Sequence, residues 1–270
     1  MTSSPRPDLA PDPALSRSEM EALQREIADA AVFADDLAFD ATAITGLESD
    51  TDARSSAVSP PQSQPADVPL VAGVDQAFSL ADERAISAVV VTRAGEVVER
   101  VSAVTPLEIP YVPGLLSFRE GGPILAALEE LTVEPDLYLF DGSGRIHFRQ
   151  AGLATHIGAV RDVPAIGVAK RLLCGTPAGD LENLPRGARV VIEADERVDA
   201  PAGTALGYAL QTKQYDSPKR YVNPLYVSPG HRVGLETAAD AVLALTAGYK
   251  LPEPIRLADA YAAEVKAGLE

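Results

Sequence analysis

Two short apolar segments of this chain have the pattern of buried β-strands, and each contains an aspartate. Asp75 lies inside the run Val71-Ala-Gly-Val-Asp75-Gln-Ala-Phe78, and Asp141 ends the run Asp136-Leu-Tyr-Leu-Phe-Asp141. An ionised carboxylate inside a buried strand is costly unless a partner compensates its charge. We therefore expect a fold that brings both strands together around a hard cation, because such ions take oxygen ligands.

A third acid, Glu120, closes the segment Pro110-Tyr-Val-Pro-Gly-Leu-Leu-Ser-Phe-Arg-Glu120 between the two aspartates. Carboxylates on strands around Mg²⁺ are typical of metal-assisted phosphodiester chemistry. Each acid also has a structural interpretation. Asp75 would then be a buried, hydrogen-bonded aspartate, Asp141 would start a turn before glycine, and Glu120 would be an ordinary glutamate at the start of a helix.

The spacing of apolar residues predicts an α/β fold. Strands are expected at residues 70–79, 86–92, 97–104, 137–140, 165–169, 189–194, 205–212 and 224–228. Helices are expected at residues 114–131, 150–160 and 234–247. The first three strands are joined by short turns, which indicates an antiparallel meander, and the fourth and fifth are joined by a helix, which indicates a parallel pair.

A meander followed by a parallel unit is the order of ribonuclease H-like folds, which have a central mixed sheet flanked by helices. In such folds a carboxylate on the first strand lies beside one at the end of the fourth strand. Asp75 and Asp141 hold those two places in this chain. The fold prediction and the burial argument therefore indicate the same metal site.

The rest of the chain divides by composition, and its 270 residues suffice for one large domain or two small ones. Residues 1–16, rich in Pro, Ser and Asp, are expected to be disordered. Residues 17–46 begin with an amphipathic helix at 17–38 that is expected to pack on the core. Residues 47–68 are predicted to be an acidic, Ser- and Pro-rich linker. Residues 69–270 are expected to form the main domain.

Targeting signals and cysteine content favour a cytoplasmic protein. No apolar stretch approaches 18 residues, so no transmembrane helix is expected. The first eight residues contain no apolar region of the kind that a secretory signal needs. Cys174 is the only cysteine, which excludes an internal disulfide and fits a reducing compartment.

The net charge of −16 argues at first against a partner that is itself a polyanion. However, the positive charges gather in residues 141–175 and 211–232, each with a net charge of +3, as phosphate binding requires. Only five of the 23 basic residues are lysines. Few lysines and many acids indicate adaptation to high salt, where net charge keeps proteins in solution; the alternative is an ordinary acidic cytosolic protein.

The motifs and their order resemble those of the endonuclease V family, which consists of inosine-directed nucleases. The matching stretches are Gly73-Val-Asp75, the segment from Pro110 to Glu120, Pro135-Asp-Leu-Tyr-Leu-Phe-Asp-Gly-Ser-Gly144, Gly152-Leu-Ala-Thr-His-Ile-Gly158, Ile166-Gly-Val-Ala-Lys170 and Tyr226-Val-Ser-Pro-Gly-His-Arg232. Two departures are Ser143, where the family often has His or Asn, and the acidic linker.

The resemblance implies roles for the acids. Asp75 and Asp141 would bind Mg²⁺, for which Mn²⁺ substitutes, and Glu120 would complete the cluster and orient the attacking water. His231 would act as an acid for the leaving oxygen or contact a phosphate, since histidine titrates near neutrality; the alternative is a surface-loop histidine. Lys170 would clamp a phosphate, or would simply be a solvated lysine at a strand end.

Recognition of the base is assigned by the same resemblance to the segment around Tyr111. Pro110 and Pro113 stiffen the backbone, so that the Tyr111 ring is held out as a wedge that fills the space of an extruded base. The alternative is a turn tyrosine packed on the core. Gly142 and Gly144 would let backbone amides approach the base, although a lone Gly-X-Gly is weak evidence and indicates no dinucleotide site.

The resemblance implies a monomeric, Mg²⁺-dependent DNA repair endonuclease that recognises deoxyinosine. Such an enzyme hydrolyses the second phosphodiester bond 3′ to the lesion and leaves 3′-hydroxyl and 5′-phosphate ends. Three alternatives remain at this point. They are a ribonuclease specific for inosine-containing RNA, a nucleic-acid-binding module that does not cleave, and an unrelated metal-dependent phosphatase.

Overall fold

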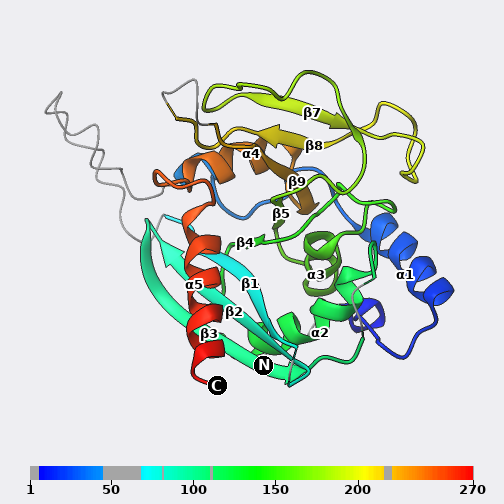
Figure 1. Cartoon of the computed structure of the whole chain (residues 1–270), viewed down its shortest axis with the longest axis vertical. Coiled ribbons are helices and arrows are strands. Elements are labelled where there is room, and N and C mark those ends of the chain that lie inside the picture. The colour runs from blue at the N-terminus through cyan, green and yellow to red at the C-terminus, as the bar shows by residue number, and fades with distance from the viewer. Residues whose placement is uncertain (1–5, 45–67, 81, 110–111, 216–220, 270) are drawn as a thin grey trace, which may run out of the picture.

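The computed structural model describes residues 6–44, 68–80, 82–109, 112–215 and 221–269 (Figure 1). Within these ranges nine strands form one sheet in the order β3-β2-β1-β4-β5-β9-β8-β7-β6. The strands are β1 (Val71–Ser79), β2 (Arg84–Arg93), β3 (Glu96–Pro106), β4 (Leu137–Phe140), β5 (Ala165–Ala169), β6 (Thr176–Pro177), β7 (Arg189–Glu193), β8 (Ala205–Leu210) and β9 (Leu225–His231). The helices are α1 (Arg17–Ala30), α2 (Leu116–Glu129), α3 (Leu153–Arg161), α4 (Leu235–Ala244) and α5 (Glu253–Ala267), with short 3₁₀ turns η1 (Pro7–Leu9) and η2 (Ala41–Ala43).

The sheet topology confirms the predicted ribonuclease H-like arrangement. β1, β2 and β3 form an antiparallel meander. β4 is parallel to both β1 and β5. These parallel pairings are possible because α2, before β4, and α3, before β5, each carry the chain back across the sheet. β9 then pairs antiparallel to β5 and extends the sheet toward β8. The central parallel strands are therefore the place where segments far apart in sequence meet.

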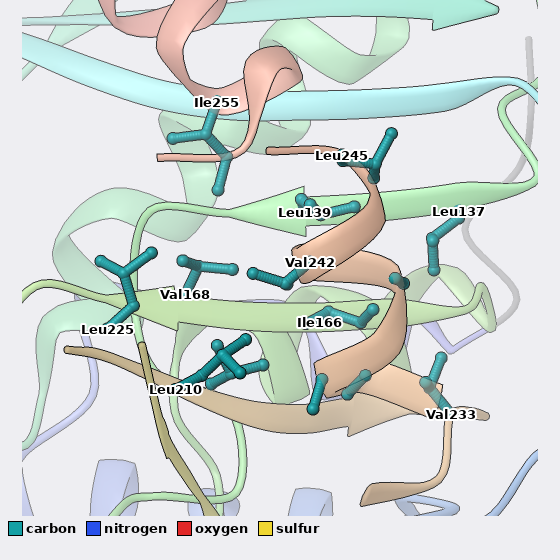
Figure 2. Packing of buried hydrophobic residues seen from close by; sticks show 14 of the residues in the cluster. Leu137, Leu139, Ile166, Val168, Leu210, Leu225, Val233, Val242, Leu245 and Ile255 are labelled. Atoms are coloured by element: carbon teal, nitrogen blue, oxygen red, sulfur yellow. The ribbon is translucent and has the colours of Figure 1, made fainter. Parts of the chain in front are cut away.

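Helices cover both faces of the sheet, and the side chains of β4 show why. Leu137 and Leu139 pack with Val242 of α4 and Ile255 of α5 on one face (Figure 2). Tyr138 and Phe140 alternate with them and pack with the apolar residues of α2 and α3 on the other face. Since successive side chains of a strand point to opposite faces, a central strand with both faces covered must be apolar throughout.

The N-terminal region differs from the sequence prediction in two respects. Residues 6–16 were expected to be disordered, yet Leu9 is only 1% exposed and packs with Ile27 and Val160. The average composition of this segment is polar, and it does not reveal that one leucine is buried against the core. The first helix ends at Ala30 rather than at residue 38, and Val32 instead bonds to Arg232 beyond β9.

The predicted linker, residues 47–68, lies almost entirely outside the described residues. α5 and the two-residue strand β6 were not predicted. Within the described ranges, no helix combines the length and the apolar character needed to cross a membrane.

Candidate active site at the carboxyl end of β4

Asp75 and Asp141 come together at the carboxyl end of β4. The last parallel pair between β1 and β4 is Val74 with Phe140, so each aspartate is the next residue along its strand. The Asp141 N–H donates a hydrogen bond to the Val74 carbonyl at 3.0 Å, which holds the two chains in register at this point. The structure therefore brings together the two carboxylates that the strand patterns singled out.

The Asp75 carboxyl group is buried and only half satisfied. It is 9% exposed, and its Oδ1 accepts a hydrogen bond from the Gln76 N–H at 2.7 Å. Its Oδ2 is buried and has no hydrogen-bond partner among the described residues. Burial, followed by the negative charge of Asp141, raises the pKa of Asp75 to about 8. Such a group favours either a proton or a cation beside it.

Glu120 is the second buried acid of this cluster, to which α2 contributes it. Burial raises its pKa to about 8; the charge of Arg119 lowers this pKa and that of Asp141 raises it. Gln76 ties the helix to the sheet, because its Nε2 donates to the Glu120 carbonyl at 3.1 Å and also to the Ser87 hydroxyl. Asp141 thus acts electrostatically on both of the other acids.

Lys170 provides a positive charge at this cluster, since it follows β5 directly and β5 lies beside β4. Its Nζ lies 2.5 Å from Asp141 Oδ2. Burial lowers the pKa of Lys170, but the hydrogen bond to Asp141 and the charges of Asp141, Asp75 and Asp259 outweigh this effect and leave it raised. Lys170 therefore stays charged and forms an ion pair with Asp141.

Asp259 is a further acid near this site that the sequence reasoning missed. Its charge raises the pKa values of both Asp75 and Lys170. It lies on α5, whose start presses on β1 so closely that a Cβ on Gly73 would come within 2.1 Å of the Pro254 carbonyl carbon. The helical spacing of Ile255, Ala258 and Ala262 was the available signal for this helix.

The structure places His231 beside the start of β5, apart from Lys170 at the end of that strand. His231 pairs with Ala165, the first residue of β5, whereas Asp141 follows Phe140, which pairs with Gly167. Its Nε2 lies 3.0 Å from Asp162 Oδ1, and its Nδ1 accepts the Val32 N–H at 3.2 Å. The predicted strand ended at residue 228, but β9 continues through Pro229 and Gly230 to His231. His231 instead fastens the N-terminal segment to the sheet.

Gly142 and Gly144 follow Asp141, but their amides are already used. The Gly142 N–H bonds to the Phe140 carbonyl at 2.9 Å, and the Gly144 N–H bonds to the Ser228 hydroxyl at 3.0 Å. A Cβ on Gly144 would lie 2.3 Å from the Pro229 carbonyl oxygen. Close packing against β9 is therefore sufficient reason for a glycine at position 144, without an approach of its amide to a base.

The segment predicted to recognise the base is described only from residue 112 onward, so that Pro110 and Tyr111 lie outside the described residues. Pro113 is exposed and precedes Gly114, which has a φ of +80°. The buried Gly114 carbonyl accepts a hydrogen bond from Gln24 Nε2 at 2.9 Å, and His147 Nε2 lies 3.1 Å away. This end of the segment is thus firmly anchored to α1 and to the loop after β4.

The acidic cluster fits a divalent cation in its chemistry. Carboxylate oxygens are the ligands that Mg²⁺ prefers, and the orphaned Oδ2 of Asp75 and the raised pKa of Glu120 both indicate charge that a cation would compensate. As the side chains stand, no three Asp, Glu, His or Cys groups in the described part of the chain are already arranged as a metal-binding set. Lys170 instead compensates Asp141, so a bound cation would have to share or replace that contact.

Comparisons with known proteins agree with this geometry. The family model for endonuclease V matches residues 52–260. The endonuclease V of Haloarcula marismortui is 59% identical over 267 residues, covering 98% of each chain. This relative is haloarchaeal, which agrees with the high-salt composition.

Two solved structures extend the similarity to the fold. The crystal structure of the Streptomyces avermitilis endonuclease V has a TM-score of 0.72 and 31% identity, covering 100% of this chain and 99% of that one. The endonuclease V of Ciona intestinalis, solved with a 24mer DNA containing an inosine followed by a ribo-adenosine, has a TM-score of 0.68 and 26% identity, covering 94% and 98%. Sequence, sheet topology and the paired aspartates all lead to one conclusion: this chain belongs to the endonuclease V family.

Proposed function

We propose that the protein is a divalent-metal-dependent DNA repair endonuclease that recognises deoxyinosine. It hydrolyses the second phosphodiester bond 3′ to the lesion and leaves 3′-hydroxyl and 5′-phosphate ends. One observation carries the proposal: Asp75 in the middle of β1 lies beside Asp141 at the end of the adjacent parallel strand β4, and a buried Asp75 oxygen has no partner among the described residues. The inosine-containing DNA bound to the Ciona relative supports the choice of substrate.

Asp75 and Asp141 would hold the cation, with Glu120 as a third oxygen donor. A bound Mg²⁺, or Mn²⁺ in its place, supplies stabilisation of the negative charge that develops on the phosphate and lowers the pKa of a coordinated water. Glu120 would also orient the attacking water; burial raises its pKa to about 8 when no cation is bound, and a bound cation would favour its ionised form. Lys170, which is bonded to Asp141, would contact a phosphate oxygen.

Tyr111, between Pro110 and Pro113, is proposed as the wedge that keeps the base extruded. Extrusion costs least for a mispaired base, which gives the selectivity for hypoxanthine a physical origin. The anchored Gly114 carbonyl supports this proposal, because a wedge is effective only if the chain that carries it cannot recoil. We also propose that the enzyme acts as a monomer.

A nicking assay on an inosine-containing duplex, with Mg²⁺ or with a chelator, tests the assignment. Asp75→Ala and Asp141→Ala should abolish nicking yet retain most of the binding to the lesion. Asp29→Ala, which removes an exposed acid on α1, is the matched control and should nick at the parent rate. Full activity of either site variant would remove the assignment.

Inosine-containing RNA is a second candidate substrate, because the nucleotide after the inosine in the Ciona complex is a ribonucleotide. Paired DNA and RNA oligonucleotides of one sequence, each with a single inosine, would separate the two activities. Faster cleavage of the RNA would make the enzyme an inosine-specific ribonuclease on the same scaffold.

A further inference from the structure

A cavity of about 310 Å³ includes Lys170 in its lining and combines basic, aromatic and polar side chains with the apolar Leu172, Leu181 and Pro224. Arg171 follows Lys170 in the chain, Tyr221 precedes β9, and Tyr226 lies in β9. Glu182 is the one acid in its lining. The volume is at the lower end of the range for sites that enclose a ligand group. The cavity is therefore contiguous with the proposed catalytic site.

Two side chains in the lining of the cavity, Tyr221 and Arg171, are exposed and accessible to a ligand. Tyr221 is 63% exposed although it is a large aromatic residue. Arg171 is exposed, and within the described residues it forms no hydrogen bond or ion pair. An exposed aromatic ring beside an uncommitted guanidinium is the combination that binds stacked bases and their phosphates.

A second cation faces Lys170 from another element. Lys250 lies in the loop before α5, and its backbone is fixed because the Thr212 hydroxyl donates to its carbonyl at 2.6 Å. Burial and the positive charge of Lys170 both lower the pKa of Lys250. In the described residues the Lys250 ammonium has no carboxylate partner within ion-pair distance.

The positive character of this surface stands out against the whole chain. The protein has a net charge of −16 and contains only five lysines. Two of them, Lys170 and Lys250, lie close enough for their charges to interact. A third, Lys213, has its Nζ 5.9 Å from the centre of the ring of Tyr249, the residue before Lys250. Charge complementarity therefore selects an anionic partner here, and the aromatic rings select one with planar groups. A nucleic-acid strand has both properties.

We propose that Arg171, Tyr221 and Lys250 form a subsite, the strand subsite, which binds unpaired nucleotides of the cleaved strand next to the scissile phosphate. A base stacks on Tyr221, and Arg171 and Lys250 contact the adjoining phosphates. Stacking is insensitive to salt, whereas phosphate contacts weaken as salt rises. The strand subsite thereby gives an acidic protein a way to hold DNA in concentrated salt. The identification of the bound strand as the cleaved DNA strand rests on the proposed function.

The test measures the affinity for two fluorescent probes in chelator, from low to molar potassium chloride. One probe is an inosine-containing duplex and the other is a single strand without inosine. Tyr221→Ala should weaken binding to both probes about tenfold at every salt concentration. Arg171→Gln and Lys250→Gln should weaken binding at low salt and each lower the slope of log affinity against log salt by about one.

Two matched controls lie on α5, away from the cavity. Tyr261→Ala removes a tyrosine whose ring lies 5.1 Å from the Arg100 guanidinium, and Lys266→Gln removes a lysine in the last turn. Both should bind as the parent does. Affinities of Tyr221→Ala equal to those of Tyr261→Ala would overturn the proposal, and because Tyr221 is exposed, the variant should fold normally.

The two proposals can fail separately in this design. If the parent nicks the inosine duplex but the strand subsite variants bind like the controls, the strand subsite is wrong and the proposed function stands. If the parent does not nick inosine-containing DNA but Tyr221→Ala still loses affinity for the single strand, the strand subsite stands and the proposed function is wrong.

Discussion

Gln24 and Gly114 are joined by a hydrogen bond across ninety residues of sequence, from the Gln24 side-chain Nε2 to the Gly114 carbonyl at 2.9 Å. Gln24 is fully buried, and its Oε1 in turn accepts a hydrogen bond from Arg149 Nε at 2.7 Å. The N-terminal helix therefore positions the segment that is proposed to carry the wedge. A polar residue on the buried face of α1 is explained by this contact rather than by packing.

Replacing Gln24 with leucine should destabilise the protein by about 1–3 kcal/mol, because the buried Gly114 carbonyl and the Arg149 guanidinium each lose a hydrogen-bond partner. Urea unfolding measures the change. Arg17→Ala, which removes an exposed ion pair with Glu21 on the same helix, should cost less than about 0.5 kcal/mol. Equal stabilities for the two variants would show that the contact with Gly114 is unimportant.

Asp75→Asn should stabilise the metal-free protein at alkaline pH. The pKa of Asp75 is raised to about 8 in the folded state, against an ordinary value near 4. Between these values the folded protein keeps a proton that the unfolded chain releases, so the parent loses stability as pH rises. Each pKa unit corresponds to about 1.4 kcal/mol, and at pH 8 we expect a gain of at least about 1 kcal/mol.

Thermal unfolding in chelator at several pH values measures this effect. The difference between Asp75→Asn and the parent should vanish below about pH 3, where Asp75 is protonated in both the folded and the unfolded parent. Asp29→Asn on the exposed surface of α1 is the matched control for the loss of one carboxylate. At pH 8 the melting temperature of Asp75→Asn should exceed that of the parent. An equal or lower melting temperature would mean that burial of the Asp75 carboxylate does not destabilise the folded protein.

The two strand aspartates could be predicted because strand patterns and burial are local properties of the sequence. Asp75 and Asp141 each sit in a short apolar run, and the meander followed by a parallel unit fixes which strand ends are neighbours. His231 and Asp259 could not be placed in this way. The role of His231 depends on how far β9 extends, and that of Asp259 depends on the close approach of α5 to Gly73.

The same distinction holds for the fold. The strands β1 to β5 follow their predicted positions closely, since alternation and turn residues define them. The ordered conformation of residues 6–16 arises from tertiary contacts of Leu9 with α1 and α3, which composition does not encode. Long-range packing thus overrides the local tendency toward disorder.

His147 and His156 should make the folded protein sensitive to acid. Burial lowers the pKa of His147 to about 3 and that of His156 to about 4. Both rings stay neutral in the fold while the unfolded chain protonates them near pH 6.5. The stability that they contribute is therefore complete above that pH and is lost as the pH falls toward 4.

Nuclear magnetic resonance of the histidine ring protons tests this directly. The signals of His147 and His156 should not titrate between pH 8 and pH 5. Over the same range, the free energy of unfolding in urea should decline below pH 6.5, by up to about 1.4 kcal/mol per pH unit for each histidine. Titration of either ring near pH 6.5 in the folded protein would contradict the prediction.

Lys170→Gln should slow the nicking of inosine-containing DNA by a factor of about 10²–10³, the usual effect of removing one charge-stabilising group from an active site. Lys170 Nζ lies 2.5 Å from Asp141 Oδ2, so its positive charge is in direct contact with the acidic cluster. Single-turnover kinetics separate this effect from DNA binding. Lys170→Arg should recover part of the rate because it keeps the charge, whereas Lys266→Gln, at the far end of α5, should leave the rate unchanged. Parent rates for Lys170→Gln would mean that its contact with Asp141 serves only the fold.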